Sequence, residues 1–386
     1  MQLKYGCNPH QTFAEIVPLV AGTSPIELLN GKPSFINYLD AINGFQLVRE
    51  LRAALELPAA ASFKHVSPAG AAVAVPLSDD RVRSYEVTGK ELTPAALAYV
   101  RARGADPKSS FGDFVALSEP VDEATARLLR PLVSDGIIAP AYEPAALAIL
   151  KAKKKGGFIV LKGDPDFSPP ARESREMFGM RLTQDRNSEP VHGAHLSNVV
   201  CGQLTSAARR DMLLGLIALK YTQSNSVGYA LDGQMIGIGA GQQSRVDCTK
   251  LAGSKADVWH LMRHPKVLAL PFKESVKRQD RINLRVRYIE GDLLPSEQET
   301  LQEAITGSLA PLTPHDKTDF IASELDGVTL ASDAFFPFRD NIDHASRHGV
   351  KYIVQPGGSV RDDDVTAACR EYGMTMVHTG LRLFHH

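Results

Sequence analysis

The segment AAASFKHVSPAG, residues 59–70, is the best guide to the fold of this chain. Its first five residues are small or apolar, which is typical of a buried strand, and the run stops at Lys64-His65. Three further apolar runs predict strands, the second with a turn inside it: residues 111–117, 133–139 and 158–161. Alanine-rich stretches between the runs predict helices: residues 41–55, 94–103 and 123–132. Alternating strands and helices predict an α/β fold.

A change of composition divides the chain. The segment GDPDFSPPAR, residues 163–172, is rich in Pro, Gly and Asp and predicts a boundary. We therefore expect two units: residues 1–172 and residues 173–386. In the second unit, residues 220–239 predict two strands joined by a turn, and residues 247–263 predict a helix. The polar, periodic residues near 290–325 predict an inserted helical segment.

Two short strings resemble each other across the predicted boundary. KHVSPAGAAVA begins at Lys64 and KYTQSNSVGYA begins at Lys220. Both read as a lysine, an aromatic ring, a polar turn and small residues that end in alanine. An echo of this kind favours a duplicated unit over chance similarity.

Composition and charge exclude several classes of protein. The 386 residues are 44% hydrophobic, with 43 Lys+Arg against 44 Asp+Glu, so there is no general field to attract nucleic acid or an anionic membrane. The four cysteines form no CxxC pair, which favours the reduced cytoplasm over a disulfide framework. No apolar run approaches the ~20 residues of a membrane span, and the N-terminus lacks the apolar core of a signal peptide.

The pair Lys64-His65 is the first candidate for catalysis. It follows a buried strand and precedes a Pro-Gly turn, and the ends of strands are where α/β sheets present reactive groups. Histidine accepts protons readily near neutral pH. A surface lysine beside a capping histidine explains the same local sequence, and from these residues alone it is the more frequent case.

Two more segments carry possible binding chemistry. GIGAGQQSR, residues 237–245, is a glycine-rich turn that exposes backbone N–H groups, and Arg245 after it offers a fork for a phosphate. The spacing fits neither a Walker loop nor a dinucleotide fingerprint, so close packing of two elements is a serious alternative. The polar run Tyr221–Ser226 lies between apolar stretches and predicts a ligand or ion site rather than an exposed loop.

The C-terminal part adds aromatic and basic groups. In SDAFFPFRDN, residues 332–341, Phe335, Phe336 and Phe338 could stack on a planar heterocycle, or the segment could cap a helix at Asp340 or Asn341. The apolar pattern of the tail LRLFHH predicts that it is packed, with Arg382 available to an anion. His192 and His195 form HxxH, but no cysteine pair or acid cluster accompanies them, so we expect no zinc.

Together these strings resemble the AICAR transformylase part of the bifunctional purine enzyme that also carries IMP cyclohydrolase. The resemblance runs from LKYGCNPHQ through SFKHVSPAGAAVA, RARGADPKSSFGDFVAL and KYTQSNSVGYA to SDAFFPFRDNID and LRLFHH. The cyclohydrolase part that normally precedes LKYG is absent from this sequence, so we expect a stand-alone transformylase. The resemblance implies two similar cytidine-deaminase-like units, a duplication, with a helical insertion and no deaminase zinc. It also implies a homodimer with active sites at the subunit interface.

The resemblance assigns roles to individual residues. His65 matches the proton acceptor, Lys64 the group that stabilises the transition state, and Asn225 a further catalytic position. Positions that hold the ribonucleotide match this set: Lys4, Tyr5, Gly112, Asp135, Asn225, Arg245, Phe335 and Arg382. Positions near the folate match a smaller set: Val246, Asp340, Ser359 and Val360. The family usually has arginine where this chain has Lys4, and lysine keeps the charge but loses the bidentate fork.

The implied reaction transfers the formyl group of 10-formyltetrahydrofolate to the amine of AICAR, and the resemblance also implies a monovalent cation such as potassium near Thr222–Asn225. Three alternatives stay open. A deaminase-like hydrolase on the same fold would need zinc ligands. A catalytically inactive nucleotide-binding homologue would not need the Lys64-His65 pair. A formate- and ATP-dependent variant would need an ATP-binding signature.

Overall fold

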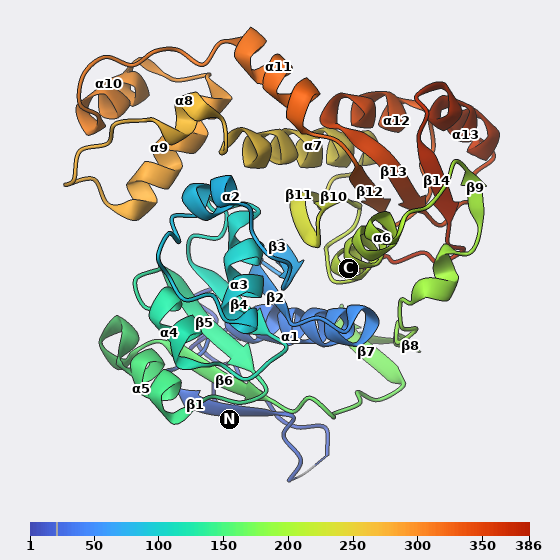
Figure 1. Ribbon diagram of the computed structural model, residues 1–386. Helices are drawn as coiled ribbons and strands as arrows, with labels where there is room; N and C mark the ends of the chain where they lie inside the picture. Colours follow the sequence, from blue (N-terminus) through green and yellow to red (C-terminus); the bar gives the residue numbers. More distant parts are fainter. Residues whose placement is uncertain (21) are drawn as a thin grey trace.

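One sheet of twelve strands forms the centre of the molecule (Figure 1). The structure is a computed structural model that describes residues 1–20 and 22–386. The strands are ordered β1-β6-β5-β4-β2-β3-β11-β10-β12-β13-β14-β9. Those of the first half are β1 (Ile26–Asn30), β2 (Ala59–Lys64), β3 (Ser67–Val73), β4 (Asp113–Leu117), β5 (Ser134–Ala139) and β6 (Ile159–Gly163). Those of the second half are β9 (Val199–Cys201), β10 (Ser226–Leu231), β11 (Gln234–Ala240), β12 (Val328–Ser332), β13 (Val350–Gln355) and β14 (Thr375–His378).

Helices lie between these strands in a repeated pattern. The first half contains α1 (Phe35–Leu55), α2 (Asp79–Ser84), α3 (Pro94–Gly104), α4 (Glu123–Leu129) and α5 (Pro144–Ala152). The second half contains α6 (Ser206–Lys220), α7 (Arg245–Leu261), α12 (Asp340–Ala345) and α13 (Asp362–Glu371). Between α7 and β12 come α8 (Pro265–Leu268), α9 (Arg278–Glu290), α10 (Pro295–Ala304) and α11 (Pro314–Glu324).

The same strand arrangement occurs twice. Counted outward from the centre of the sheet, each half starts with an antiparallel hairpin, β2–β3 or β10–β11. A strand antiparallel to the hairpin follows, β4 or β12, and then two strands parallel to that one, β5–β6 or β13–β14. An antiparallel strand, β1 or β9, completes the outer edge. The two halves meet where β3 pairs with β11.

The echo between the two KxxxxxxxxxA strings does not mark equivalent positions in this repeat. Lys64 ends β2 and is followed by a turn into β3, whereas Lys220 ends helix α6 and is followed by a loop into β10. One polar segment joins two strands and the other joins a helix to a strand. The strand order does repeat, but the prediction that these two strings occupy equivalent positions in the repeat was wrong.

Alternating side chains place the core on both faces of the sheet. On β4, Phe114 and Ala116 belong to an apolar cluster with α1 and α6, whereas Val115 and Leu117 belong to a cluster with α3, α4 and α5. In the second half the corresponding outer cluster is formed with α7, α12 and α13. Helices α1 and α6 contact each other, so one layer spans both halves of the molecule.

Several expected elements are confirmed, and two are corrected. Strands β2, β4 and β6 and helices α3 and α7 agree with the predicted ranges to within a few residues. The run at residues 133–139 holds no turn, because β5 continues unbroken from Ser134 to Ala139 beside β4 and β6. The inserted helices begin at Pro265, well before residue 290, and pack around an apolar cluster of their own.

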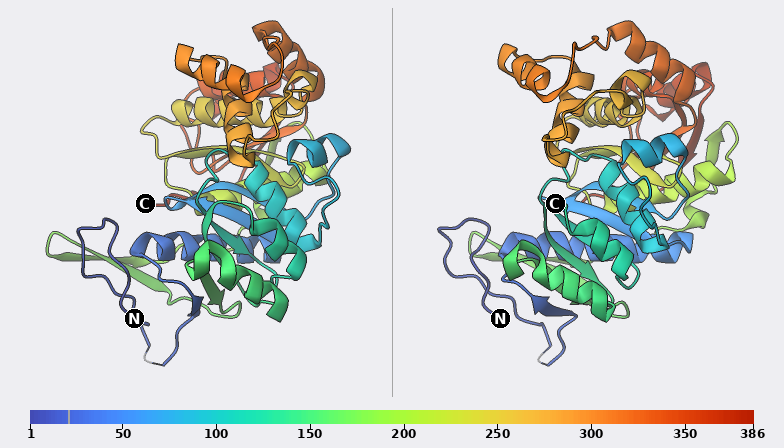
Figure 2. Two further views of the ribbon diagram at one scale, coloured as in Figure 1. Left: turned by 90° about the vertical axis from the view of Figure 1, so that its left-hand side faces the viewer. Right: turned by 60° about the vertical axis from the view of Figure 1, so that its left-hand side comes forward.

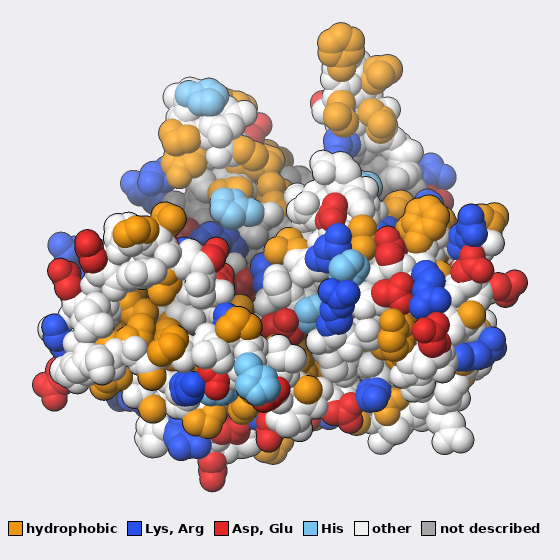
Figure 3. Space-filling model, turned by 90° about the horizontal axis from the view of Figure 1, so that it is seen from above, with side chains coloured by type: hydrophobic (Ala, Val, Ile, Leu, Met, Phe, Trp, Pro, Cys, Tyr) orange, Lys and Arg blue, Asp and Glu red, His pale blue; other side chains and the backbone are white. Residues whose placement is uncertain are grey.

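The surface shows mixed charge and one projection. Basic and acidic side chains are interspersed over the face seen in Figure 3. A separate hairpin, β7 (Arg172–Met177) and β8 (Met180–Asp185), extends away from the body (Figure 2). None of the described helices combines the length and the apolar character that a bilayer crossing needs.

Candidate active site

The direction of the strands brings the predicted site residues to one edge of the sheet. Because β3 and β11 pair antiparallel at its centre, the second half runs opposite to the first. The amino ends of β4 and β5 therefore lie at the same edge as the carboxyl ends of β12, β13 and β14. Open α/β sheets bind ligands at the carboxyl ends of their strands, and at this edge those are the ends of β12, β13 and β14.

The tight turn between β2 and β3 presents Lys64 and His65. His65 and Val66 have φ angles of 54° and 62°, and the His65 side chain is exposed. Lys64 Nζ donates a hydrogen bond to the carbonyl oxygen of Phe111 at 2.5 Å. It also lies 4.0 Å from where a Cβ atom of Gly112 would stand, so Lys64 and Gly112 are neighbours, and the φ of 78° is what requires glycine there.

A carboxylate that sequence reasoning missed holds this turn. Asp40 on α1 is 7% exposed, and its Oδ1 accepts a hydrogen bond from the Val66 backbone N–H at 2.6 Å. Burial raises the pKa of Asp40 from 3.8 to about 6, although the Val66 N–H and the charge of His65 act in the lowering direction. A signal was present, because Asp40 stands among buried residues of the helix, but its partner lies on another element.

We expect Asp40→Asn to change the pH dependence of folding. Asp40 binds its proton more tightly in the folded than in the unfolded chain, so its burial lowers stability fully above pH 6 and not at all below about pH 3.8. Asparagine keeps the acceptor oxygen and removes the charge. The free energy of unfolding should rise by up to ~3 kcal/mol at pH 8 and change little near pH 4.

Urea unfolding at a series of pH values measures this effect. The exposed Asp363→Asn is the matched control and should leave the profile unchanged. An Asp40→Asn protein with the wild-type pH profile would show that Asp40 is not the group that titrates.

Three further predicted residues lie beside the start of α1 and on β5. The carbonyl of Tyr5 accepts from the backbone N–H of Phe35 at the start of α1, and Lys4 Nζ lies 5.5 Å from the Tyr5 ring centre. Lys4 is exposed and makes no ion pair among the residues that the structure describes. Asp135 is half exposed and pairs with Lys154 at 2.7 Å.

A buried ion pair organises the second group of predicted residues. The Arg245 guanidinium pairs with Asp333, and these side chains are 7% and 0% exposed. Arg245 Nη2 donates to Asn225 Oδ1 at 2.7 Å, and Nη1 also donates to Ser332 Oγ at 3.1 Å. Both terminal nitrogens are thus engaged inside the protein. This geometry favours Arg245 as the residue that orients Asn225, while its predicted phosphate contact stays a prediction.

Asp333 also fixes the polar run that precedes β10. Its Oδ2 accepts from Ser224 Oγ at 2.6 Å and from the Ser226 backbone N–H at 2.9 Å. Asn225 Nδ2 donates to the carbonyl oxygens of Gln242 and Gln243 at 3.0 and 3.2 Å. The run is therefore held by hydrogen bonds within the protein. Asp333 was not among the predicted site residues.

The glycine-rich segment before Arg245 serves packing at two of its positions. A Cβ atom at Gly237 would lie 2.1 Å from the carbonyl oxygen of Ala252, and one at Gly239 would lie 2.2 Å from that of Cys248. Both contacts are to α7, so these glycines let the helix approach β11. The packing alternative holds for them, and only Gly241, with a φ of 69° and open space around it, lies in the turn itself.

Loops after β12 and β13 carry the remaining predicted residues. Phe335 and Phe338 are 40% and 58% exposed, but Phe336 is fully buried in the core and cannot stack on a ligand, which corrects the expectation for all three rings. Asp340 begins α12 and accepts from Asn341 Nδ2 at 2.9 Å. The other residues predicted to lie near the folate are at the same edge of the sheet. Val246 is partly buried at the start of α7, Ser359 is partly buried, and Val360 is fully exposed.

The C-terminal tail is packed against the second group, as its pattern predicted. The His385 N–H donates to Ser224 Oγ at 3.1 Å, the Leu383 N–H donates to the Asp333 carbonyl at 2.8 Å, and Leu383 is buried. Arg382, just before Leu383, is exposed, with its guanidinium 4.7 Å from the Phe384 ring centre. The tail thus places beside the Asn225 loop a cation that has no ion pair with any described residue.

The two groups are in direct contact at the centre of the sheet. The backbone N–H of Gln223, in the polar run, donates to Ser67 Oγ at 3.3 Å. Ser67 follows the turn that carries His65, and Gln223 lies two residues before Asn225. An exposed imidazole, an ammonium group and a positioned amide therefore lie around one edge, which is suited to proton transfer and to stabilising negative charge.

The HxxH pair caps a short helix. His192 Nδ1 accepts from the Ala194 N–H at 3.3 Å, and His195 Nδ1 accepts from the His192 N–H at 3.2 Å. One potential ligand atom from each of these histidines and from Glu189 lie within 4.8 Å of one another. This cluster lies on the loop before β9, apart from the residues predicted for catalysis, and the expectation of no zinc stays a prediction.

Comparison with known proteins gives a consistent result. Residues 1–255 match the family described as AICARFT/IMPCHase bienzyme. Bifunctional purine biosynthesis protein PurH of Xylella fastidiosa strain 9a5c is 32% identical over 390 residues, with 100% of this chain and 58% of that protein covered. The protein of the same name from Cereibacter sphaeroides strain ATCC 17029 is 32% identical over 387 residues, with 100% and 59% covered. The chain thus spans less than two thirds of the length of these relatives.

Proposed function

The chain belongs to the AICARFT/IMPCHase bienzyme family, and we propose that it transfers the formyl group of 10-formyltetrahydrofolate to the 5-amine of AICAR, releasing tetrahydrofolate. The observation that carries this proposal is the contact between the His65 turn and the Asn225 loop at one sheet edge. Purine synthesis in the cytoplasm is the matching context, and four free cysteines suit its reducing conditions.

The residues divide the chemistry as follows. The AICAR amine is conjugated with its carboxamide and is a poor nucleophile, so a base must take its proton as the new C–N bond forms. The exposed His65 imidazole takes that proton, and help of this kind amounts to roughly 10²–10⁴-fold in rate. Lys64 stabilises the oxyanion that forms at the formyl group. As the bond between the formyl carbon and N10 breaks, the protonated His65 passes its proton to N10, and the amide of Asn225 supports this leaving nitrogen.

Substrate binding in this proposal rests on exposed cations and on one exposed aromatic ring. Lys4 and Arg382 are exposed and meet the phosphate of the nucleotide, while Phe335 packs on its imidazole ring. Arg245 acts through Asn225, and Tyr5, Gly112 and Asp135 complete the nucleotide side. The folate lies over residues of the second half that stand at the starts of α7 and α12 and on the loop after β13: Val246, Asp340, Ser359 and Val360.

The proposal extends to architecture and assembly. The repeated strand order supports two cytidine-deaminase-like units that arose by duplication. The β7–β8 hairpin supports a homodimer, because its tip exposes Met177, Phe178 and Met180, and apolar surface of this kind is normally covered by a partner. A monovalent cation beside Thr222–Asn225 is part of the proposal and is tested by the dependence of turnover on potassium.

Spectrophotometric release of tetrahydrofolate tests the reaction. Turnover is expected with AICAR and 10-formyltetrahydrofolate together, and none when either is left out. Turnover only with formate and ATP would replace the formyl donor. A folded protein that binds AICAR without turnover would be an inactive homologue, and this would overturn the proposal.

Lys4→Arg is expected to tighten AICAR binding several-fold. Arginine adds the bidentate fork that lysine lacks, and the exposed position has room for it. Isothermal titration calorimetry gives the dissociation constant. The exposed Lys351→Arg, at the amino end of β13, serves as the control and should change nothing. Unchanged or weaker binding in Lys4→Arg would show that Lys4 does not contact the phosphate.

A further inference from the structure

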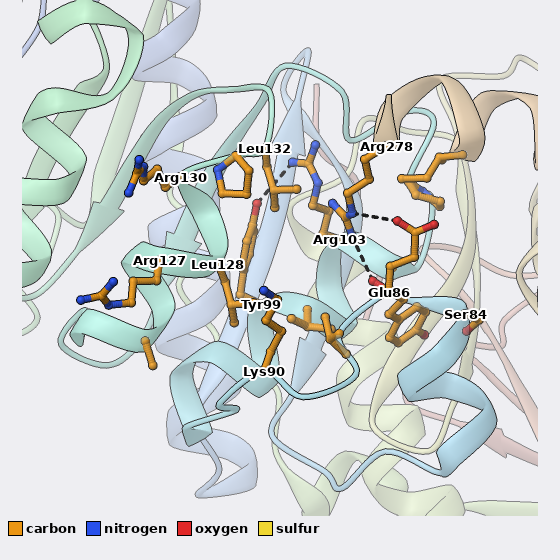
Figure 4. A pocket seen from close by; sticks show the side chains of 18 of the residues that line it. Ser84, Glu86, Lys90, Tyr99, Arg103, Arg127, Leu128, Arg130, Leu132 and Arg278 are labelled. Atoms are coloured by element: carbon orange, nitrogen blue, oxygen red, sulfur yellow. Dashed lines mark hydrogen bonds and ion pairs between the residues drawn. The ribbon is translucent and has the colours of Figure 1, made fainter. Parts of the chain in front are cut away.

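A cavity of about 530 Å³ lies between the first half and the inserted helices (Figure 4). Its walls come from the segment after α2, from α3 and α4, and from α9 of the insertion. None of the residues assigned above to catalysis or to substrate binding lines it. Its volume falls in the ≈ 300–1,000 Å³ range of small-molecule sites and is far larger than a single inorganic anion needs.

The walls combine apolar surface with basic groups. One side is formed by Tyr99, Leu128 and Leu132, and the other carries Arg103 and Arg278 (Figure 4). Arg103 is neutralised, because it pairs with the buried Asp113 at 2.7 Å. Burial of the apolar side would favour the hydrophobic body of a ligand.

The basic residues that line the cavity outnumber the acids, which are Glu86 and Glu91: Lys90, Arg103, Arg127, Arg130 and Arg278. Three guanidinium groups converge on Glu86: Arg278 at 3.3 Å, which lines the cavity, and behind the wall Arg281 at 3.1 Å and Arg285 at 2.6 Å. One carboxylate cannot balance three cations. Lys90 is exposed, its ammonium group points into the cavity in Figure 4, and it makes no ion pair within the described part of the chain. The cavity is therefore electropositive on the side of Glu86 and Lys90.

We propose that this cavity is a second ligand site, which binds a small organic anion with its apolar body against Leu128 and Leu132 and its charged group at Lys90 and Arg278. The charged group is a phosphate or a carboxylate, since both accept hydrogen bonds from these cations. Because α3 belongs to the first half and α9 to the insertion, an occupant links the two and stabilises their contact. The inference goes beyond the transformylase reaction and does not depend on it.

The chain contains its own reporter for this site. Trp259 is the single tryptophan, and its Nε1 donates to Tyr85 Oη at 2.9 Å. Tyr85 lines the cavity, so occupancy should change the tryptophan fluorescence. We would titrate the full chain with adenosine 5′-monophosphate, with phenylacetate and with inorganic phosphate. A saturable change is expected with one of the two organic anions, and the one that binds identifies phosphate or carboxylate as the charged group.

Three variants separate this site from the active site. Lys90→Gln removes one charge-assisted hydrogen bond and should weaken binding roughly tenfold. The exposed Lys351→Gln, which does not line the cavity, should leave the affinity unchanged. Arg382→Gln should weaken AICAR binding at the active site and leave the fluorescence titration unchanged.

Four outcomes would overturn the proposal. The proposal would fail if neither organic anion bound, or if Lys90→Gln bound the ligand as tightly as the wild type. It would also fail if Arg382→Gln abolished the fluorescence change, because this would place the ligand in the active site. Inorganic phosphate that binds as tightly as the organic anions would remove the role of the apolar wall. Loss of turnover alone, with fluorescence binding intact, would count against the transformylase function and not against this site.

Discussion

Replacing His65 by alanine is expected to lower kcat by roughly 10²–10⁴-fold while the AICAR dissociation constant changes little. The side chain is exposed at the tip of the β2–β3 turn and makes no hydrogen bond among the described residues, so its removal leaves the fold intact. Tetrahydrofolate release gives kcat, and calorimetry gives the nucleotide affinity. A fall in kcat without a change in affinity is the mark of a group that acts only in the transition state.

The backbone at His65 demands a second variant. Its φ of 54° is tolerated better by asparagine than by alanine, so His65→Asn keeps the turn and removes the base. In both variants kcat should fall by the same order of magnitude. His315→Ala, on the exposed face of α11, is the control and should retain full turnover. Wild-type kcat in His65→Asn would exclude the imidazole as the base.

The elements that the sequence predicted are those whose signal is local. Residues 59–63, 111–117 and 158–161 are apolar runs between polar or glycine-containing segments, and each became a strand at the expected place. The packed tail also follows from a local pattern, because Leu383 is buried while its neighbours are exposed. Such patterns survive folding because each strand buries its side chains whichever strand it pairs with.

The features that the sequence did not predict depend on contacts between distant residues. Asp40 and Val66 are 26 positions apart, and Arg245 and Asp333 are 88 positions apart. Nothing near Asp333 indicates which cation neutralises it. The two lysine-containing strings failed as evidence of repetition for the same reason, since their likeness says nothing about whether a helix or a strand precedes the turn. The register between the two halves is likewise a property of the folded sheet.

Asp333→Ala is expected to lower the free energy of unfolding by ~3–5 kcal/mol, because it leaves the buried Arg245 guanidinium without its counter-charge. The backbone N–H of Ser226 loses its acceptor as well. Urea unfolding followed by circular dichroism measures the change. The exposed pair of Arg361 and Asp364 provides the comparison: Asp364→Ala should cost less than ~1 kcal/mol.

A double variant distinguishes the charge from the side-chain volume. Arg245→Met combined with Asp333→Ala removes the orphaned cation, so it should be more stable than Asp333→Ala alone. It should still turn over slowly, because Asn225 loses the guanidinium that orients it. Stability regained without activity would assign the ion pair a positioning role in addition to its structural one. A double variant no more stable than Asp333→Ala would mean that the empty space at residue 333, rather than the unpaired charge, destabilises the fold.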